Sequence, residues 1–292
     1  MRIERLDAPT CIGGENPIWD SSTQTLLYID NSGRKVHSFA PATGASRTLE
    51  MPAVITTLLL REAGGAVVTL RSGIFFLDLG TGSLEPIHPL TDPAPHVFND
   101  GAVDGRGRAI LGASTPHSAN PGTEGGLFRL DRDLSLHRLD SGIHFSNGPC
   151  WAPDGRTFYF SDSWINTVYA YDYDIEAGTV SGKRTFADTS ELGGLPDGAT
   201  VDADGLYWAA IFRSGKVVAY RPDGKLERVI DLPVKLVSSV AFGGAALDQL
   251  YVTTMARAST EVDQSGWGLQ AGSLFVIEGA GARGRPEYRF AR

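Results

Sequence analysis

The sequence predicts an all-β fold, a six-bladed β-propeller with four-stranded antiparallel blades. Two observations lead to this prediction: short apolar runs alternate with turns along the whole chain, and one pattern recurs at intervals of one blade. The chain contains 35 glycines and 16 prolines and shows almost no helical periodicity, which favours strands joined by tight turns. We therefore expect a single propeller domain spanning residues 1–292.

The recurring pattern is a polar residue followed, four positions later, by a bulky apolar one. Small or apolar residues, often Gly or Pro, fill most of the gap, as in GENPIW and SNGPCW. The intervals between successive polar positions are 41, 43, 48, 50 and 41 residues, which is the period of propeller blades with four strands each. The six polar positions are Glu15, Thr56, Asn99, Asn147, Asp197 and Ser238.

The strands and turns within one repeat can be read from residues 25–44, TLLYIDNSGRKVHSFAPATG. A strand at 26–30 and a turn at 31–33 precede a second strand at 35–39 and a second turn at 41–44. Similar stretches follow each of the other polar positions. Each repeat thus consists of an inner strand, two further strands with their turns, and a variable outer segment.

The two ends of the chain are expected to close the ring. A strand-like piece, Met1–Leu6, precedes the first repeat, and 54 residues follow Ser238. One end should supply a strand to the blade built by the other, because this removes exposed sheet edges. We expect the segment Glu287–Phe290 to form a late outer strand.

Composition and charge exclude several classes of protein. The formal net charge of −8 argues against a nucleic-acid partner, which requires a basic face. No apolar run approaches the roughly 18 residues of a membrane span, and the N-terminus lacks the apolar core of a signal peptide. The only cysteines are Cys11 and Cys150, too few for a disulfide framework. A cytoplasmic protein with no membrane partner is therefore expected, and Cys150 is interpreted as a small core residue.

The six polar positions should meet in space, since the innermost strand of every blade runs along the central channel of a propeller. Glu15, Asn147 and Asp197 would bring two carboxylates and an amide carbonyl to one mouth of this channel. Such hard oxygen ligands suit Ca²⁺, Mg²⁺ or Mn²⁺, and a carboxylate-rich site is also compatible with Zn²⁺ or Fe²⁺. Three protein ligands leave positions for water and substrate. On the next blade, Asn99 and Asp100 are placed to hold a ligand hydroxyl.

An alternative is that these polar residues only satisfy backbone groups at strand ends and turns. This interpretation is preferred for Asp154 in PDGR and Asp223 in PDGK, which are turn residues. No zinc-motif spacing, GxSxG elbow or GxGxxG loop occurs, so zinc-peptidase, serine-hydrolase and nucleotide sites have no support. His117, in the loop at 114–126, either reaches over the channel mouth or is an ordinary solvated loop histidine.

Four stretches resemble the gluconolactonase, regucalcin (SMP-30) and luciferin-regenerating-enzyme family. They are GGENPIW at 13–19, FNDGAVDGRGR at 98–108, SNGPCWAPDGRTFYFSDS at 146–163 and LPDGATVDADGLYWAA at 195–210. The resemblance covers essentially the whole chain and implies a six-bladed propeller with one divalent cation in its channel. It places the family's metal ligands on Glu15, Asn147 and Asp197, and its substrate contacts on Asn99 and Asp100.

The sequence also departs from the family pattern. Val97 stands where many relatives carry an arginine, and His117 falls near a position where some carry a glutamate. Both changes concern recognition of substrate hydroxyls, so they affect specificity rather than the metal. The motif SNGPC resembles that of bacterial lactonases of pentose and hexose acids. The family resemblance also implies a monomer.

The expected function is metal-dependent hydrolysis of a sugar-derived aldonolactone to its aldonic acid. Asp197 is the candidate base that activates the attacking water. Thr56 and Ser238 complete the wall as spacers, and Trp267, in the loop at 256–272, either lines the pocket or anchors that loop. Two alternatives stay open: a metal-dependent esterase or phosphotriesterase on the same scaffold, and a calcium-binding propeller without catalysis.

Overall fold

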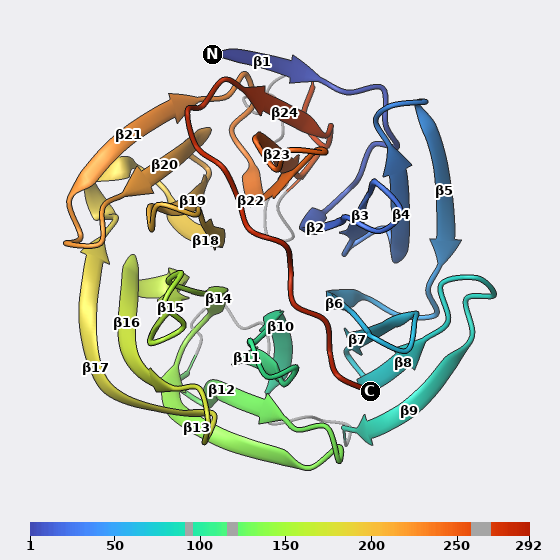
Figure 1. Ribbon diagram of the computed structural model, residues 1–292, viewed down its shortest axis with the longest axis vertical. Helices are drawn as coiled ribbons and strands as arrows, with labels where there is room; N and C mark the ends of the chain where they lie inside the picture. The colour runs from blue at the N-terminus through green and yellow to red at the C-terminus, as the bar shows by residue number, and fades with distance from the viewer. Residues whose placement is uncertain (91–95, 116–121, 258–269) are drawn as a thin grey trace.

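The chain forms a ring of six four-stranded antiparallel sheets (Figure 1), and the inner strands line a cavity in the channel at its centre. This computed structural model describes residues 1–90, 96–115, 122–257 and 270–292. The arrangement confirms the predicted six-bladed propeller. None of the helices in the described residues is long and apolar enough to cross a membrane.

The strands fall into four layers, from the channel outward. The innermost strands are β2 (Gly14–Asp20), β6 (Ile55–Leu60), β10 (Val97–Val103), β14 (Ser146–Trp151), β18 (Leu195–Val201) and β22 (Val237–Gly243). The second strands are β3 (Thr25–Asp30), β7 (Ala66–Leu70), β11 (Ala109–Ser114), β15 (Thr157–Asp162), β19 (Tyr207–Phe212) and β23 (Gln249–Thr254). The third strands are β4 (Lys35–Ala40), β8 (Gly73–Leu77), β12 (Gly125–Leu130), β16 (Thr167–Asp174), β20 (Lys216–Tyr220) and β24 (Phe275–Glu278). The outer strands are β5 (Ala45–Glu50), β9 (Leu84–Pro89), β13 (Leu136–Ile143), β17 (Thr179–Asp188), β21 (Leu226–Asp231) and β1 (Arg2–Arg5).

We number the blades 1 to 6 in the chain order of their inner strands. Two short 3₁₀ helices accompany blade 4, η1 (Ser163–Ile165) between β15 and β16 and η2 (Ser190–Leu192) after β17. The second strands are apolar on both faces; every residue of β7 and β11, for example, is buried. Both faces are buried because each blade packs against a neighbour on either side. The outer strands are largely exposed, as in β5 with the sequence ASRTLE.

The hydrophobic core is divided among the blade interfaces rather than gathered in one place. The described residues form six apolar clusters, one between each pair of neighbouring blades. Trp208 and Phe242, for example, meet edge-to-face between blades 5 and 6, with ring centroids 6.0 Å apart. At roughly 1.5–3 kcal/mol for each large apolar side chain buried, these interfaces hold the inner strands in fixed positions around the channel.

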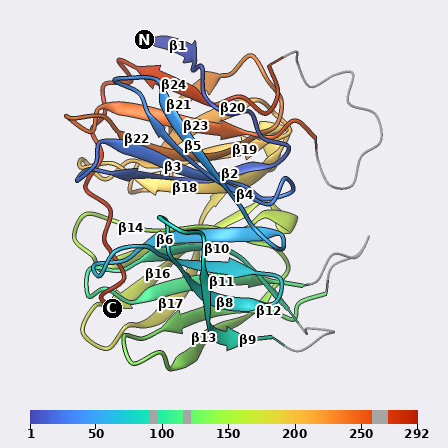
Figure 2. The same ribbon diagram turned by 90° about the vertical axis from the view of Figure 1, so that its right-hand side faces the viewer.

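The N-terminus closes the ring as the sequence predicts. Strand β1 pairs antiparallel with β24, from Arg2 opposite Glu278 to Arg5 opposite Phe275. Blade 6 therefore combines three strands from the end of the chain with one from its beginning, and Figure 2 shows β1 at the rim beside β24. The pairing covers the edge that β24 would otherwise expose.

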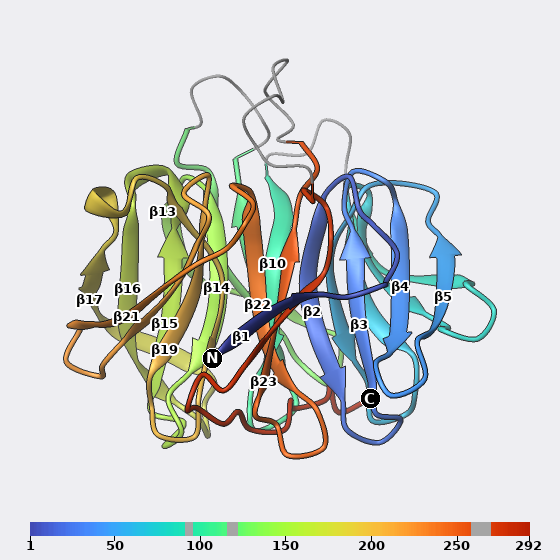
Figure 3. The same ribbon diagram turned by 90° about the horizontal axis from the view of Figure 1, so that it is seen from above.

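The prediction of an outer strand at Glu287–Phe290 is wrong. This part of the chain belongs to a C-terminal tail, residues 283–292, that crosses the centre of the ring (Figure 1) at the end opposite to the first residues of β2 (Figure 3). Phe290 is fully buried, and its N–H donates to the Leu60 carbonyl at 2.8 Å. The outer edge of blade 6 is already occupied by β1, so no edge is left for the tail to extend.

Candidate metal and substrate site in the channel

A β-bulge interrupts every inner strand at or just after its polar position. Register shifts fall between Glu15 and Ile18 in β2, between Asn147 and Cys150 in β14, and in the corresponding places of the other inner strands. A bulge places two residues opposite one on the partner strand and redirects the side chains beside it. The small residues and prolines of the repeated pattern therefore mark the points where polar side chains turn toward the channel.

Three carboxylates from three blades converge in the channel. Burial raises the pKa of Glu15 well above its ordinary value, and the charges of Asp197 and Asp100 raise it further. Burial and the charge of Asp100 likewise raise the pKa of Asp197, whose residue is only 7% exposed. Burial also raises the pKa of Asp100 to about 6, although its carboxylate accepts the N–H groups of Gly148 at 2.8 Å and Gly101 at 2.7 Å.

The two asparagines lie beside these carboxylates and bond to each other. Asn99 Nδ2 donates to Asn147 Oδ1 at 2.9 Å and to the Ser146 carbonyl at 2.8 Å. Asn147 is buried, and its Nδ2 donates to Ser163 Oγ at 2.9 Å. Ser163 Oγ in turn donates to the Pro196 carbonyl at 2.5 Å, which links the amide to the strand that carries Asp197. These bonds fix the amide of Asn147 so that its nitrogen points to Ser163 and its carbonyl oxygen stays on the side of Asn99.

The donor set fits a hard divalent cation. Glu15, Asp100 and Asp197 repel one another, and the influences on the pKa values of Glu15 and Asp197 within the described residues include no basic side chain. Buried carboxylates without a counter-charge take up protons, whereas a divalent cation allows them to remain ionised. The structure thus brings together Glu15, Asn147 and Asp197 with Asn99 and Asp100, and the oxygens present are those that such ions prefer.

Of the remaining positions singled out for the channel site, the structure describes Thr56, Ser238 and Val97. Thr56 Oγ1 bonds to Thr69 Oγ1 at 2.7 Å and Ser238 Oγ donates to the Gly14 carbonyl at 2.5 Å, so both hydroxyls are used in holding strands together. Val97 is the first residue of β10. His117 and Trp267 lie outside the described residues, and their roles stay predictions.

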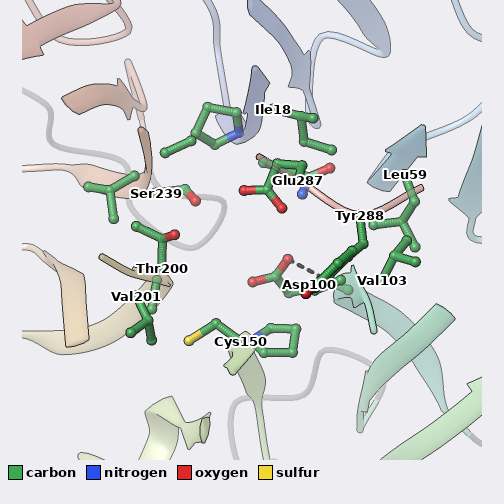
Figure 4. A pocket seen from close by; sticks show the side chains of 18 of the residues that line it. Ile18, Leu59, Asp100, Val103, Cys150, Thr200, Val201, Ser239, Glu287 and Tyr288 are labelled. Carbon is green, nitrogen blue, oxygen red and sulfur yellow. Dashed lines mark hydrogen bonds between the residues drawn. The ribbon is translucent and has the colours of Figure 1, made fainter. Parts of the chain in front are cut away.

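A cavity of about 110 Å³ lies in the channel between the inner strands and the C-terminal tail (Figure 4). Asp100, Thr200, Ser239 and Glu287 point polar atoms into it, and Cys150 lies on its wall. The Glu287 residue is exposed at the open space of the cavity, yet the protein packed around its carboxylate keeps it from full solvation and raises its pKa to about 6. The tail thus places a fourth carboxylate in the channel.

Sequence reasoning did not find Glu287. It follows the last blade and belongs to no repeat, so its neighbours in the sequence carry no signal of its place in the channel. Asn16 was also missed: its Oδ1 accepts the Leu58 N–H at 2.6 Å and so fastens the bulge of blade 1 to blade 2. Its position directly after Glu15 in GENPIW, before a proline, is a signal that could have identified it.

Comparisons with known proteins agree with this architecture. Pentonolactonase XacC of Haloferax volcanii is 35% identical over 293 residues, covering 99% of this chain and 98% of that protein. Regucalcin of Oryctolagus cuniculus is 32% identical over 296 residues, covering 100% and 99% of the two chains. The crystal structure of a calcium-binding protein, regucalcin, from Agrobacterium tumefaciens superimposes with a TM-score of 0.90 at 26% identity, covering 99% of this chain and 97% of that one.

The family model described as the SMP-30/gluconolactonase/LRE-like region matches residues 13–256, from the turn before Glu15 to the end of blade 6's second strand. This match includes all six inner strands with Glu15, Asn99, Asp100, Asn147 and Asp197, whereas Glu287 in the tail lies beyond it. The chain belongs to the SMP-30/gluconolactonase/LRE-like family.

Proposed function

We propose that the channel site hydrolyses the lactone of a sugar acid to the open-chain acid with the help of one divalent cation. The observation that carries this proposal is the convergence of Glu15, Asn147 and Asp197 in a channel where the described residues supply no basic counter-charge to them. Lactone hydrolysis as a reaction class is also supported by the lactonase among the relatives.

Glu15, Asn147 and Asp197 would hold the cation, which would supply Lewis-acid stabilisation of the negative charge that develops on the lactone carbonyl oxygen. Asp197 is the proposed base. It would take a proton from the attacking water as the new bond to the carbonyl carbon forms. The ring C–O bond then breaks, and the proton is returned to the leaving alkoxide.

Asn99 and Asp100 are proposed to orient the sugar. Both hydrogens of the Asn99 amide are used, toward Ser146 and Asn147, so its Oδ1 is the atom placed to accept a bond from a substrate hydroxyl. Asp100 is held by two backbone N–H groups and keeps free lone pairs on both oxygens. His117 stays a predicted contact in the loop at 114–126.

The proposed substrates are pentono- and hexonolactones. The pentonolactonase from Haloferax volcanii supports a five-carbon acid, and the side-chain oxygens of Asn99 and Asp100 are acceptors for the hydroxyls of such a ligand. The proposed cation is consistent with the regucalcin structure from Agrobacterium tumefaciens, which is described as that of a calcium-binding protein.

The test is hydrolysis of a lactone panel by protein stripped with a chelator and resupplied with single metals. We expect activity to disappear on chelation and return with one or more divalent ions, and kcat/KM for aldonolactones to exceed that for aryl esters and phosphotriesters. The variant Asp197→Asn should lose roughly 10²–10⁴-fold in kcat, the typical contribution of a general base.

Asp154→Asn is the matched control. Asp154 is a turn residue whose Oδ1 accepts the Arg156 N–H at 2.9 Å, so its substitution changes one acidic side chain at a distance from the channel. It should retain activity, and circular dichroism should show both variants folded. Full activity of the stripped protein, or of a folded Asp197→Asn variant, would rule out the proposed mechanism.

A further inference from the structure

A second group of metal-binding side chains lies in blade 1, set back from the channel. Cys11 precedes β2, Asp30 ends β3 and His37 lies on β4, and these residues are 5%, 3% and 3% exposed. A ring nitrogen of His37, a carboxylate oxygen of Asp30 and Cys11 Sγ all lie within 4.8 Å of one another. Neither Cys11 nor His37 belongs to the channel site described above.

His37 has one ring nitrogen bonded and one without a partner. Nδ1 lies 2.8 Å from Thr48 Oγ1, whereas buried Nε2 has no hydrogen-bond partner in the described part of the chain. A buried polar atom without a partner costs about 1–3 kcal/mol, so such atoms require an explanation. If Nδ1–H donates to Thr48, Nε2 presents a lone pair, as in histidines whose orientation toward a metal is fixed through the other nitrogen.

Asp30 by itself has an ordinary structural role. Its carboxylate accepts the N–H groups of Ile12 at 3.0 Å and Gly13 at 2.8 Å, just before β2 begins at Gly14. Asp162 does the same in blade 4, where it accepts the two N–H groups before Ser146 at 3.0 and 3.1 Å. Register confirms the equivalence, since Gly14 pairs with Asp30 and Ser146 with Asp162. The aspartate therefore serves the fold in both blades.

What distinguishes blade 1 is the pair of side chains around this aspartate. Cys11 stands three residues before the inner strand, where blade 4 has Ile143. His37 is paired with Tyr28, two positions before Asp30. The equivalent residue of blade 4 is Tyr169, which is paired with Phe160, two positions before Asp162. The fold therefore accepts apolar and aromatic side chains at these two places, and a thiol and an imidazole are not needed for the backbone clamp.

We propose that Cys11, Asp30 and His37 form a second metal site, for a transition-metal ion such as Zn²⁺, separate from the channel. One sulfur, one nitrogen and one oxygen are ligand types that Zn²⁺ accepts, with a fourth position for water. Zinc would hold these atoms about 3.5 Å apart, given Zn–S near 2.3 Å and Zn–N near 2.0 Å.

Protonation is compatible with this assignment. Burial lowers the pKa of His37, so the imidazole is neutral and able to donate its lone pair. Burial raises the pKa of the Cys11 thiol, so the thiol keeps its proton without a metal and would release it to solvent when the ion binds. The next residue, Ile12, is 36% exposed, so the path from the surface is short.

The chemistry of the two sites allows an experiment that separates them. The proposed channel ligands are all oxygens, so only the second site can give thiolate-to-cobalt charge transfer in the near ultraviolet. Full-length protein would be stripped with a chelator and titrated with Co²⁺. We expect two bound equivalents and a charge-transfer band in the unmodified chain, and one equivalent without the band in Cys11→Ser.

Three further variants complete the experiment, the first two of them as controls. Cys150→Ser removes the other buried cysteine and should keep the band, and Glu15→Gln should keep the band while weakening the channel site. His37→Gln, for which folding is checked by its melting temperature, should weaken Co²⁺ binding at the thiolate site at least tenfold. His37→Gln keeps the test valid if Cys11→Ser does not fold. The proposal fails if the unmodified chain shows no band, or if the band survives in Cys11→Ser or is unaffected in folded His37→Gln.

Discussion

At the scale of single residues, burial of acidic groups raises their pKa values in the channel, and repulsion by Asp100 adds to this effect for Glu15 and Asp197. Glu15, Asp100 and Asp197 come from blades 1, 3 and 5; Asp197 is buried, the other two are half-buried, and the charge of Asp100 raises the pKa of both Glu15 and Asp197. The folded state pays for this arrangement unless protons or a cation compensate the charge. The same cluster that makes the site chemically useful therefore makes the protein's stability sensitive to pH and to metal.

We predict that the metal-free protein becomes more stable as the pH falls from about 8 to about 5. The pKa of Asp100 is about 6 in the folded protein against an ordinary 3.8, so the folded state binds this proton more tightly than the unfolded chain. The resulting stabilisation is fully present below the unfolded pKa and is lost as pH rises through about 6. The difference corresponds to at most about 3 kcal/mol, reduced by the water that the cavity admits.

Thermal melts with chelator at several pH values measure this dependence. Added divalent cation should reverse it, because the ion binds ionised carboxylates and its stabilisation grows with pH. Asp100→Asn should flatten the metal-free curve. A metal-free melting temperature that does not change between about pH 5 and about pH 8 would contradict the prediction.

The grouping of these polar positions was predictable because they recur at one place in a repeated unit, whereas their roles in binding and catalysis stay predictions. Glu15, Asn147 and Asp197 could be named from spacing and chemistry, since the repeat specifies where each inner strand begins. Glu287 could not, because the tail lies outside the repeat and its position depends on contacts with several blades. The pairing of Cys11 with His37 was equally hidden, since it depends on the register of three neighbouring strands.

At the scale of elements, the inner-strand bulges connect sequence to chemistry. In β14 the bulge contains Gly148, whose φ of +59° is favourable for glycine and strained for other residues. Its N–H reaches the Asp100 carboxylate at 2.8 Å. A Cβ at this position would lie 2.9 Å from the Asp197 carbonyl oxygen and 2.9 Å from Ala199 Cβ. The glycine thus permits close approach of the strands that carry Asn147 and Asp197.

We predict that Gly148→Ala lowers kcat/KM at least tenfold by moving Asp197. The control is Gly155→Ala, at a turn with a similar φ of +68° and no atom within 4 Å of the added Cβ. Both variants should lose about 1–2 kcal/mol of unfolding free energy from the left-handed backbone. Only Gly148→Ala adds the collision, so only it should lose activity in a folded protein. Equal kcat/KM for the two variants would show that the close approach is unimportant.

Element prediction succeeded where hydrophobic runs and turns alternate, and failed at the C-terminal tail. The segment Glu287–Phe290 has the length of a short strand, but strand formation requires a free sheet edge. Strand β1 takes the outer edge of blade 6, and the tail instead packs Phe290 against Phe76, with ring centroids 6.4 Å apart. Whether the N-terminal or the C-terminal segment pairs with the outer edge of blade 6 depends on contacts between segments far apart in the sequence. It therefore cannot be predicted from local sequence.

At the scale of the whole molecule, both termini hold the ring together. Strand β1 completes blade 6, while the tail reaches from Gly284, which bonds to Leu247 in blade 6, to Ala291, which bonds to Gly107 in blade 3. The tail also closes one end of the channel at the cavity that contains Glu287. The six interface clusters alone would leave the outer edge of blade 6 exposed and this end of the channel uncovered.

Deleting residues 1–6 should therefore lower the melting temperature and cause association. The deletion exposes β24, whose sequence FVIE would present an unpaired apolar edge to other chains, and it removes Ile3 from the cluster between blades 5 and 6. Arg2→Ala is the control: it removes the ion pairs of Arg2 with Glu278 at 2.8 Å and with Glu4 at 3.0 Å, at a highly exposed position where such pairs contribute little stability, and it leaves the strand in place. Melting curves and light scattering distinguish the two variants.

The proposed channel ligands are unchanged in the truncated protein, so its lactone hydrolysis should follow the fraction that remains folded. A truncated chain that stays monodisperse and melts with the full-length protein would show that the six blade interfaces suffice without this closure.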